Sequence, residues 1–221
     1  MRILAISITA MALISTGAIG QDISPEAFDA RGYVADLNAV SENWHEGELT
    51  NSDIVIIAAV GCSTLRKIKA DDLMGHAARW INAAGYPEPN LIENTQMQDF
   101  ITFEVDAFKE AGATDATLNL LDKALRERAI LPVEAPSFEL MLNGAEEQYC
   151  GARLLNGTDP GAPASEAQVV LAGSVVDSAV GASLIAVDAA IGAGSGGIAA
   201  GFFAILSGGV GYDLLKRGLG G

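Results

Sequence analysis

The sequence predicts an all-α protein: a small helical bundle outside the cytoplasm, followed by a glycine-rich hydrophobic C-terminal helix or helical hairpin. Through most of residues 24–150, apolar side chains recur three or four positions apart, the spacing of one helix face. After residue 165 the chain becomes almost uncharged and rich in glycine and aliphatic side chains. A short apolar N-terminus of the kind that directs export precedes both segments.

Residues 1–20 are predicted to be a signal peptide. Arg2 provides a positive start, and an apolar stretch from Ile3 to Ala18 follows it. Ala18, Ile19 and Gly20 place small residues where a signal peptidase reads them, so cleavage is expected before Gln21. An uncleaved N-terminal anchor is the alternative interpretation. Either way the sequence predicts an exported protein of the cell envelope, with its acidic part periplasmic or extracellular.

The chain is strongly acidic. It has 13 Lys and Arg against 28 Asp and Glu, for a formal charge of −15. Removal of residues 1–20 takes away Arg2 and leaves 12 basic and 28 acidic residues, a charge of −16. Nucleic acid and anionic lipid attract clusters of Lys and Arg, so neither is expected as a partner. The many acidic residues between Gln21 and Gly61 are interpreted as solvated surface.

The two cysteines, Cys62 and Cys150, predict one disulfide, because a pair of cysteines in an exported chain usually forms a bridge. Closing a loop of this length would contribute roughly 4–5 kcal/mol in the chain-entropy model. Two free buried thiols are the alternative. A catalytic role for Cys62 is not expected, because neither histidine stands at an informative spacing from it.

Six helices are expected within residues 21–155. Their starts are marked by capping residues near Ser24, Asn51, Asp71, Asn94, Thr114 and Ser137. Their ends are marked by Gly47, Gly85, Gly112 and the Leu131-Pro132 pair. Two stretches leave a strand possible. Residues 54–60 are continuously apolar, and residues 101–105 alternate, but helical spacing continues from the first stretch to Ile68 and favours a helix there.

A linker over residues 156–164 divides the predicted domains. It is rich in Gly, Pro and Asp, and it includes an Asn-x-Thr glycosylation pattern at Asn156. The expected plan is a signal peptide at 1–20, an acidic helical domain at 21–155, the linker, and a membrane-associated segment at 165–221.

The C-terminal segment is predicted to enter a membrane. Asp177 and Asp188 are the only charges between Val169 and Tyr212, and Ala189–Tyr212 is an uncharged run of 24 residues. Such a run is long enough to cross a bilayer, and Lys216 and Arg217 follow it as a stop-transfer pair. A single span is the preferred arrangement. The alternative is a hairpin of residues 169–190 and 197–215 that turns at 192–197.

Two features of this segment predict helix packing. The Gly-x-x-x-Gly pairs Gly192/Gly196 and Gly197/Gly201 would let two membrane helices approach closely. Ser174, Gly181 and Asp188 stand seven residues apart. Asp177 and Asp188 stand eleven apart, close to three helical turns, which gives a narrow polar seam on an apolar helix. Carboxylates in such a seam usually meet a partner or a water-filled lumen. The alternative interpretation is that Asp177 and Asp188 mark the helix as interfacial or soluble.

No constellation for catalysis is found. His45 is expected in a solvated turn and His76 in packing, and neither stands at a metal-ligand spacing. No catalytic residue, metal or cofactor is therefore expected. The sequence favours a non-enzymatic envelope protein, anchored by its C-terminal membrane helix, that self-associates or binds another membrane protein. The alternative is a pore-forming or toxin-like protein that inserts a glycine-rich hairpin.

Overall fold

The computed structural model describes residues 28–45, 48–151, 159–195 and 198–220, so the predicted signal peptide and the Ser24 cap lie outside the described part. Within that part the chain is helical, without strands, and the all-α prediction is confirmed. The α-helices are α1 (Ala30–Asn43), α2 (Asn51–Ala70), α3 (Leu73–Ala84), α4 (Asn94–Glu110), α5 (Asp115–Arg126), α6 (Ala135–Cys150), α7 (Glu166–Ser195) and α8 (Ile198–Gly218). A short 3-10 helix, Pro89–Leu91, precedes α4.

Local side-chain caps set several of these boundaries. Thr50 and Asp53 form a reciprocal capping box at the start of α2, and Thr114 accepts a hydrogen bond from the Thr117 amide at the start of α5. Gly85 and Gly112 follow α3 and α4 with positive φ angles of 81° and 94°. Both glycines are therefore in a backbone conformation that ends helices, as the sequence predicts. The two stretches that left a strand possible lie inside α2 and α4, so both are helical.

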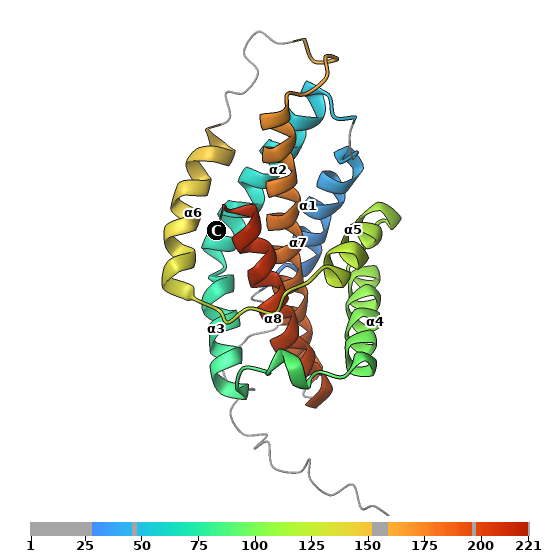
Figure 1. Ribbon diagram of the computed structural model, residues 1–221, viewed down its shortest axis with the longest axis vertical. Coiled ribbons are helices and arrows are strands. Elements are labelled where there is room, and N and C mark those ends of the chain that lie inside the picture. Colours follow the sequence, from blue (N-terminus) through green and yellow to red (C-terminus); the bar gives the residue numbers. More distant parts are fainter. Residues whose placement is uncertain (1–27, 46–47, 152–158, 196–197, 221) are drawn as a thin grey trace, which may run out of the picture.

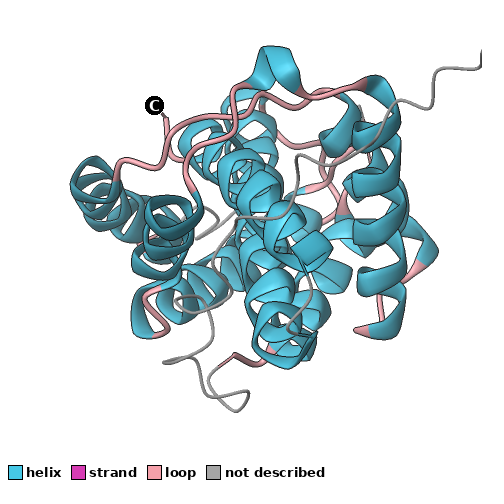
Figure 2. Cartoon of the chain, turned by 90° about the horizontal axis from the view of Figure 1, so that it is seen from below, coloured by secondary structure: helices cyan, strands magenta, loops and turns pink. Residues whose placement is uncertain are grey.

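Helices α7 and α8 run through the middle of the molecule. Figure 1 shows α7 in orange and α8 in red side by side along the long axis, with α3 and α6 on one side and α4 and α5 on the other. Helices α1 and α2 pack along α7, and α3 packs along α8. Figure 2, turned by 90°, shows the same bundle of helices and loops from one end. The other helices therefore surround a central pair.

The C-terminal apolar segment shares one core with the helices before it. Val175, Val180 and Ile185 of α7 are buried in the same cluster as Leu37 of α1 and Ile57 of α2. Apart from its narrow polar seam, α7 is aliphatic, and the apolar faces of α1 and α2 cover part of its aliphatic surface.

The preferred single span over residues 189–212 is not the arrangement in this structure. Helix α7 continues through this region to Ser195, and α8 starts again at Ile198. Gly181 lies against Gly211, and Asp188 contacts Ser207 nearer the bend, so the two helices are antiparallel. The two helices follow the order and direction of the hairpin alternative, and other helices of the same chain pack against them. The position of this segment in a membrane stays a prediction.

The described end of the predicted linker, residues 159–164, is held against the start of α2. The Asn51 amide donates to the Ala162 carbonyl at 3.0 Å, and the Ala164 amide donates to the Leu49 carbonyl at 2.8 Å. These bonds place the first turn of α7 beside the first turn of α2. The glycosylation pattern at Asn156 lies outside the described residues.

Candidate functional site

The candidate site is the buried hairpin of α7 and α8, where the two backbones nearly touch. A Cβ atom added at Gly181 would lie 2.5 Å from the Gly211 carbonyl oxygen, and one added at Gly211 would lie 2.9 Å from the Gly181 oxygen. At the end of α8, a Cβ on Gly218 would lie 2.4 Å from the Ser174 carbonyl oxygen. Real Cβ contacts are longer, so glycine at these three positions allows the close packing.

The predicted polar seam faces α8 within the hairpin. Ser174 lies against Gly218, Gly181 lies against Gly211, and Asp188 accepts a hydrogen bond from Ser207. The glycines singled out in the sequence are nearer the bend. Gly192 lies in α7 and Gly201 in α8, whereas Gly196 and Gly197 are outside the described residues. Each glycine contact described here joins parts of one chain.

Several elements cover the hairpin directly. Ser183 of α7 donates to the Tyr33 carbonyl oxygen of α1 at 3.2 Å. A Cβ on Gly61 of α2 would lie 2.5 Å from the Val175 side chain. A Cβ on Gly208 of α8 would lie 3.8 Å from the Ala77 Cβ of α3. The cover is therefore in close contact with both helices of the hairpin.

A carboxyl pair is buried near the bend of the hairpin. Asp188 of α7 and Glu104 of α4 are 2% and 0% exposed, and their carboxyl groups are close enough to share a hydrogen bond when one of them holds a proton. Ser207 of α8 donates to Asp188 Oδ2. Burial, together with the negative charge of Asp188, holds the pKa of Glu104 well above its usual range. The pair therefore joins α4 to both helices of the hairpin.

The other end of the hairpin is more polar. Asp177 is half-buried, and the charged groups near it are Arg217, Asp213, Glu127 and Lys123. Arg217 forms an ion pair with Asp213 at 2.8 Å, and Asp213 also accepts from the Ala129 amide at 3.3 Å. The predicted stop-transfer residues Lys216 and Arg217 thus lie in the last turn of α8, where Arg217 is exposed.

Helix α6 covers the end of α8 and is tied to α2 by a disulfide. The structure joins Cys62 to Cys150 with Cα atoms 4.9 Å apart. Next to this bridge, the Tyr149 hydroxyl donates to the Gly218 carbonyl at 2.6 Å and lies 3.3 Å from Ser178 Oγ. Burial raises the pKa of Tyr149, so its hydroxyl keeps its proton.

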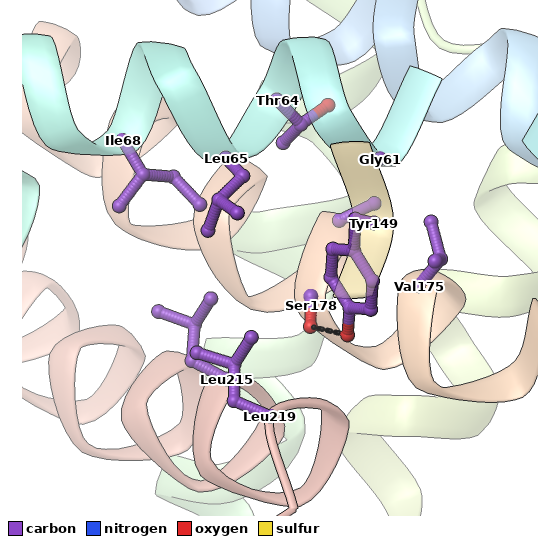
Figure 3. A pocket seen from close by; sticks show the side chains of 10 residues that line it. Gly61, Thr64, Leu65, Ile68, Tyr149, Val175, Ser178, Leu215 and Leu219 are labelled. Carbon is purple, nitrogen blue, oxygen red and sulfur yellow. Dashed lines mark hydrogen bonds between the residues drawn. The ribbon is translucent and has the colours of Figure 1, made fainter. Parts of the chain in front are cut away.

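The cavity inside the bundle offers little room for a small ligand. Figure 3 shows Tyr149 and Ser178 at a cavity of about 10 Å³ that Val175 and Leu215 also line. That volume holds one water molecule at most. A larger open groove of about 430 Å³ lies along the outer face of α4, between its acidic side chains and Ile191. In the described residues no group of three His, Cys, Asp or Glu side chains is placed to hold a metal ion.

The two histidines lie where the sequence suggests. His45 is exposed, and its carbonyl accepts from the Glu48 amide in a turn. His76 packs edge-on against Phe28 with ring centroids 4.6 Å apart. Burial lowers the pKa of His76, so the ring is neutral at pH 7.

Sequence reasoning missed Glu104 and Tyr149. Glu104 stands three residues after Ile101 and four after Phe100, on the apolar face of α4. Had a helix been assigned to residues 101–105, its spacing would have placed the Glu104 carboxylate on the core-facing side of that helix. Tyr149 gives no comparable signal. Its partner Gly218 is distant in sequence, and the hydrogen bond is accepted by the backbone carbonyl of Gly218, which has no side chain.

Comparisons with known proteins add no family to this picture. No protein-family model matches the chain, and neither a curated protein nor a solved structure matches it.

Proposed function

We propose that this chain is a non-enzymatic, exported envelope protein that stores an apolar helical hairpin inside a water-soluble bundle and transfers it to a membrane. The observation that carries the proposal is the central position of α7 and α8, covered by other helices of the same chain. It combines the envelope location expected from the sequence with the hairpin-inserting alternative.

One helix of the hairpin, α7, contains a stretch with the length and composition that a membrane span requires. Residues Glu166–Ile191 form a stretch of 26 residues that is long and apolar enough to cross a bilayer, and 72% of its most apolar part is buried inside the bundle. At 1.5 Å per residue, about 20 residues cross the hydrocarbon layer. The core helix of a water-soluble protein has the same properties, so length alone does not carry the proposal.

The internal contacts of the hairpin favour transfer as one unit. The close approach at Gly181 and Gly211 joins α7 only to α8, and a similar approach joins Gly218 to Ser174. Asp188 is hydrogen-bonded to Ser207, which belongs to the same hairpin. These contacts need no other helix, so they can persist in lipid, where a bare charged carboxylate would cost about 2.5–3.5 kcal/mol.

A permanent anchor that self-associates through Gly-x-x-x-Gly motifs is the competing arrangement. It requires α7 or α8 to face lipid or another molecule at all times. The burial of Val175, Ile185, Leu206 and Val210 within the bundle favours the stored hairpin instead. The two arrangements differ in whether the bundle must open.

A disulfide between α3 and α8 tests that difference. The ideal Gly208 Cβ lies 3.8 Å from the Ala77 Cβ, which is the usual separation across a disulfide. The mature chain with Ala77→Cys and Gly208→Cys, oxidised, should release no dye from phosphatidylcholine vesicles under conditions where the unmodified chain does. Neutral lipid is chosen because the chain is acidic and anionic vesicles would repel it.

The controls are Ala77→Cys alone and Gly208→Ala, both of which should release dye as the unmodified chain does. Reductant should restore dye release by the stapled variant. Because the reductant also breaks the natural Cys62–Cys150 bridge, dye release by the unmodified chain is measured with the same reductant. Dye release by the fully stapled protein would refute transfer of the hairpin. Failure of the unmodified chain to bind or permeabilise vesicles from pH 4 to pH 8 would refute the proposal as a whole.

A further inference from the structure

Among the described residues, the carboxyl pair of Glu104 and Asp188 has no counter-ion. Within that part of the chain, Ser207 donates to Asp188, and Asp188 is the charged group that acts on Glu104. The exposed acids Asp99, Asp106 and Glu110 of α4 line the groove on its outer face. On α7, Asp177 stands eleven residues from Asp188, about three turns away, and the charged groups that act on it are Arg217, Asp213, Glu127 and Lys123.

The hydrogen bond within the pair requires a proton. If both groups were ionised, neither oxygen of Glu104 nor Oδ1 of Asp188 would have a hydrogen-bond donor among the described residues. Two buried carboxylates in contact would also repel each other in surroundings that screen charge poorly. One shared proton removes the repulsion and supplies the missing donor.

We propose that Glu104 and Asp188 form a proton-dependent latch, which fastens the bend end of the hairpin to α4 while the pair holds a proton and releases it when that proton is lost. The latch joins α4 to the two consecutive helices of the hairpin, α7 and α8, which are distant from α4 in sequence. The apolar neighbours Phe100 and Phe108 keep water away from Glu104, since both are fully buried. The latch depends on the packing of α4 against the hairpin and not on transfer to a membrane.

The direction of the pH effect follows from the proton count. Glu104 has an ordinary pKa of 4.5, and burial raises its pKa well above that value in the folded chain. The folded chain therefore holds a proton that the unfolded chain has lost. The stabilisation of the folded chain by this proton is complete when the pH is below the ordinary pKa of Glu104. It declines as the pH rises through the raised pKa of Glu104 in the folded chain.

The test compares thermal unfolding of the mature chain and of Glu104→Gln between about pH 5 and pH 9, the range in which a raised carboxyl pKa would act. Glutamine keeps a donor to Asp188 but does not titrate. The Tm of the unmodified chain should fall by roughly 5 °C more than that of the variant over this range. Asp99→Asn, an exposed change on the same helix, should keep the unmodified pH dependence.

Asp188→Asn is the second variant, and it should also flatten the pH dependence. Hydrogen exchange should show α4 opening before α1 and α2 as the pH rises in the unmodified chain. Unchanged pH dependence in both Glu104→Gln and Asp188→Asn would overturn the latch. These measurements use no membrane, so their outcome is independent of the vesicle experiment.

Discussion

The variant with Cys62→Ala and Cys150→Ala is expected to lose roughly 4–5 kcal/mol of unfolding free energy in the chain-entropy model. The disulfide joins residues with a sequence separation of 88, so its removal frees a long loop in the unfolded chain. That loss is comparable with much of the total stability of a typical domain, about 5–15 kcal/mol. Urea unfolding of both proteins measures it.

The denaturant slope provides an independent check of the cause. Without the bridge the unfolded chain is more extended, so the slope m should increase while the helical content of the folded protein stays the same. Helix α6 should exchange its amide hydrogens faster, because the bridge at Cys150 is its covalent link to α2. A loss of less than about 1 kcal/mol would show that the bridge contributes little.

Gly181→Ala is expected to cost about 1–3 kcal/mol, as overpacking of a tight core does. The new methyl group would lie 2.5 Å from the Gly211 carbonyl oxygen and 3.0 Å from the Leu215 amide nitrogen. Both are backbone atoms of α8, so the clash cannot be relieved by a change of rotamer, and α8 must move away from α7. Urea unfolding and the exchange rates of α8 amides measure the effect.

Gly144→Ala is the matched control for that variant. Gly144 lies inside α6, and a Cβ there would meet nothing within 4 Å. Alanine favours a helix over glycine by about 1 kcal/mol, so this variant should be slightly more stable than the unmodified chain. If both variants were destabilised equally, the close approach of α7 and α8 would not be the cause.

The helices were largely predictable because their signals are local. The cap at Thr114 and the stop at Gly112 depend on neighbouring residues only. Apolar spacing continues to Ile68, which correctly favoured a helix where a strand was possible in α2. The alternation at Ile101, Phe103 and Val105 was misleading, because Phe100, Glu104 and Phe108 form the buried face of α4.

The surroundings of α7 could not be predicted from its composition. An aliphatic helix is stable in lipid and equally stable in the core of a bundle, because both remove it from water. The difference depends on whether helices elsewhere in the chain have apolar faces free to cover it. Those faces belong to α1, α2 and α3, and their match to α7 and α8 emerges only in three dimensions.

The partners within the candidate site were hidden for a similar reason. The seam of Ser174, Gly181 and Asp188 could be recognised from its seven-residue spacing. Its contacts on α8 depend on how α8 packs antiparallel to α7; they are Gly218, Gly211 and Ser207. The pairing of Asp188 with Glu104 depends on how α4 crosses the hairpin. Long-range pairs of this kind leave no spacing signal in one sequence.

Hydrogen exchange of the mature chain in detergent-free buffer tests the central claim most directly, namely that the hairpin is the core of a water-soluble bundle. The amides of residues 175–189 should be protected to the same degree as the best-protected amides of α1 and α2, and should open with them only in global unfolding. Rapid exchange in residues 175–189 while α1 and α2 stay protected would contradict it, as would a chain that dissolves only with detergent.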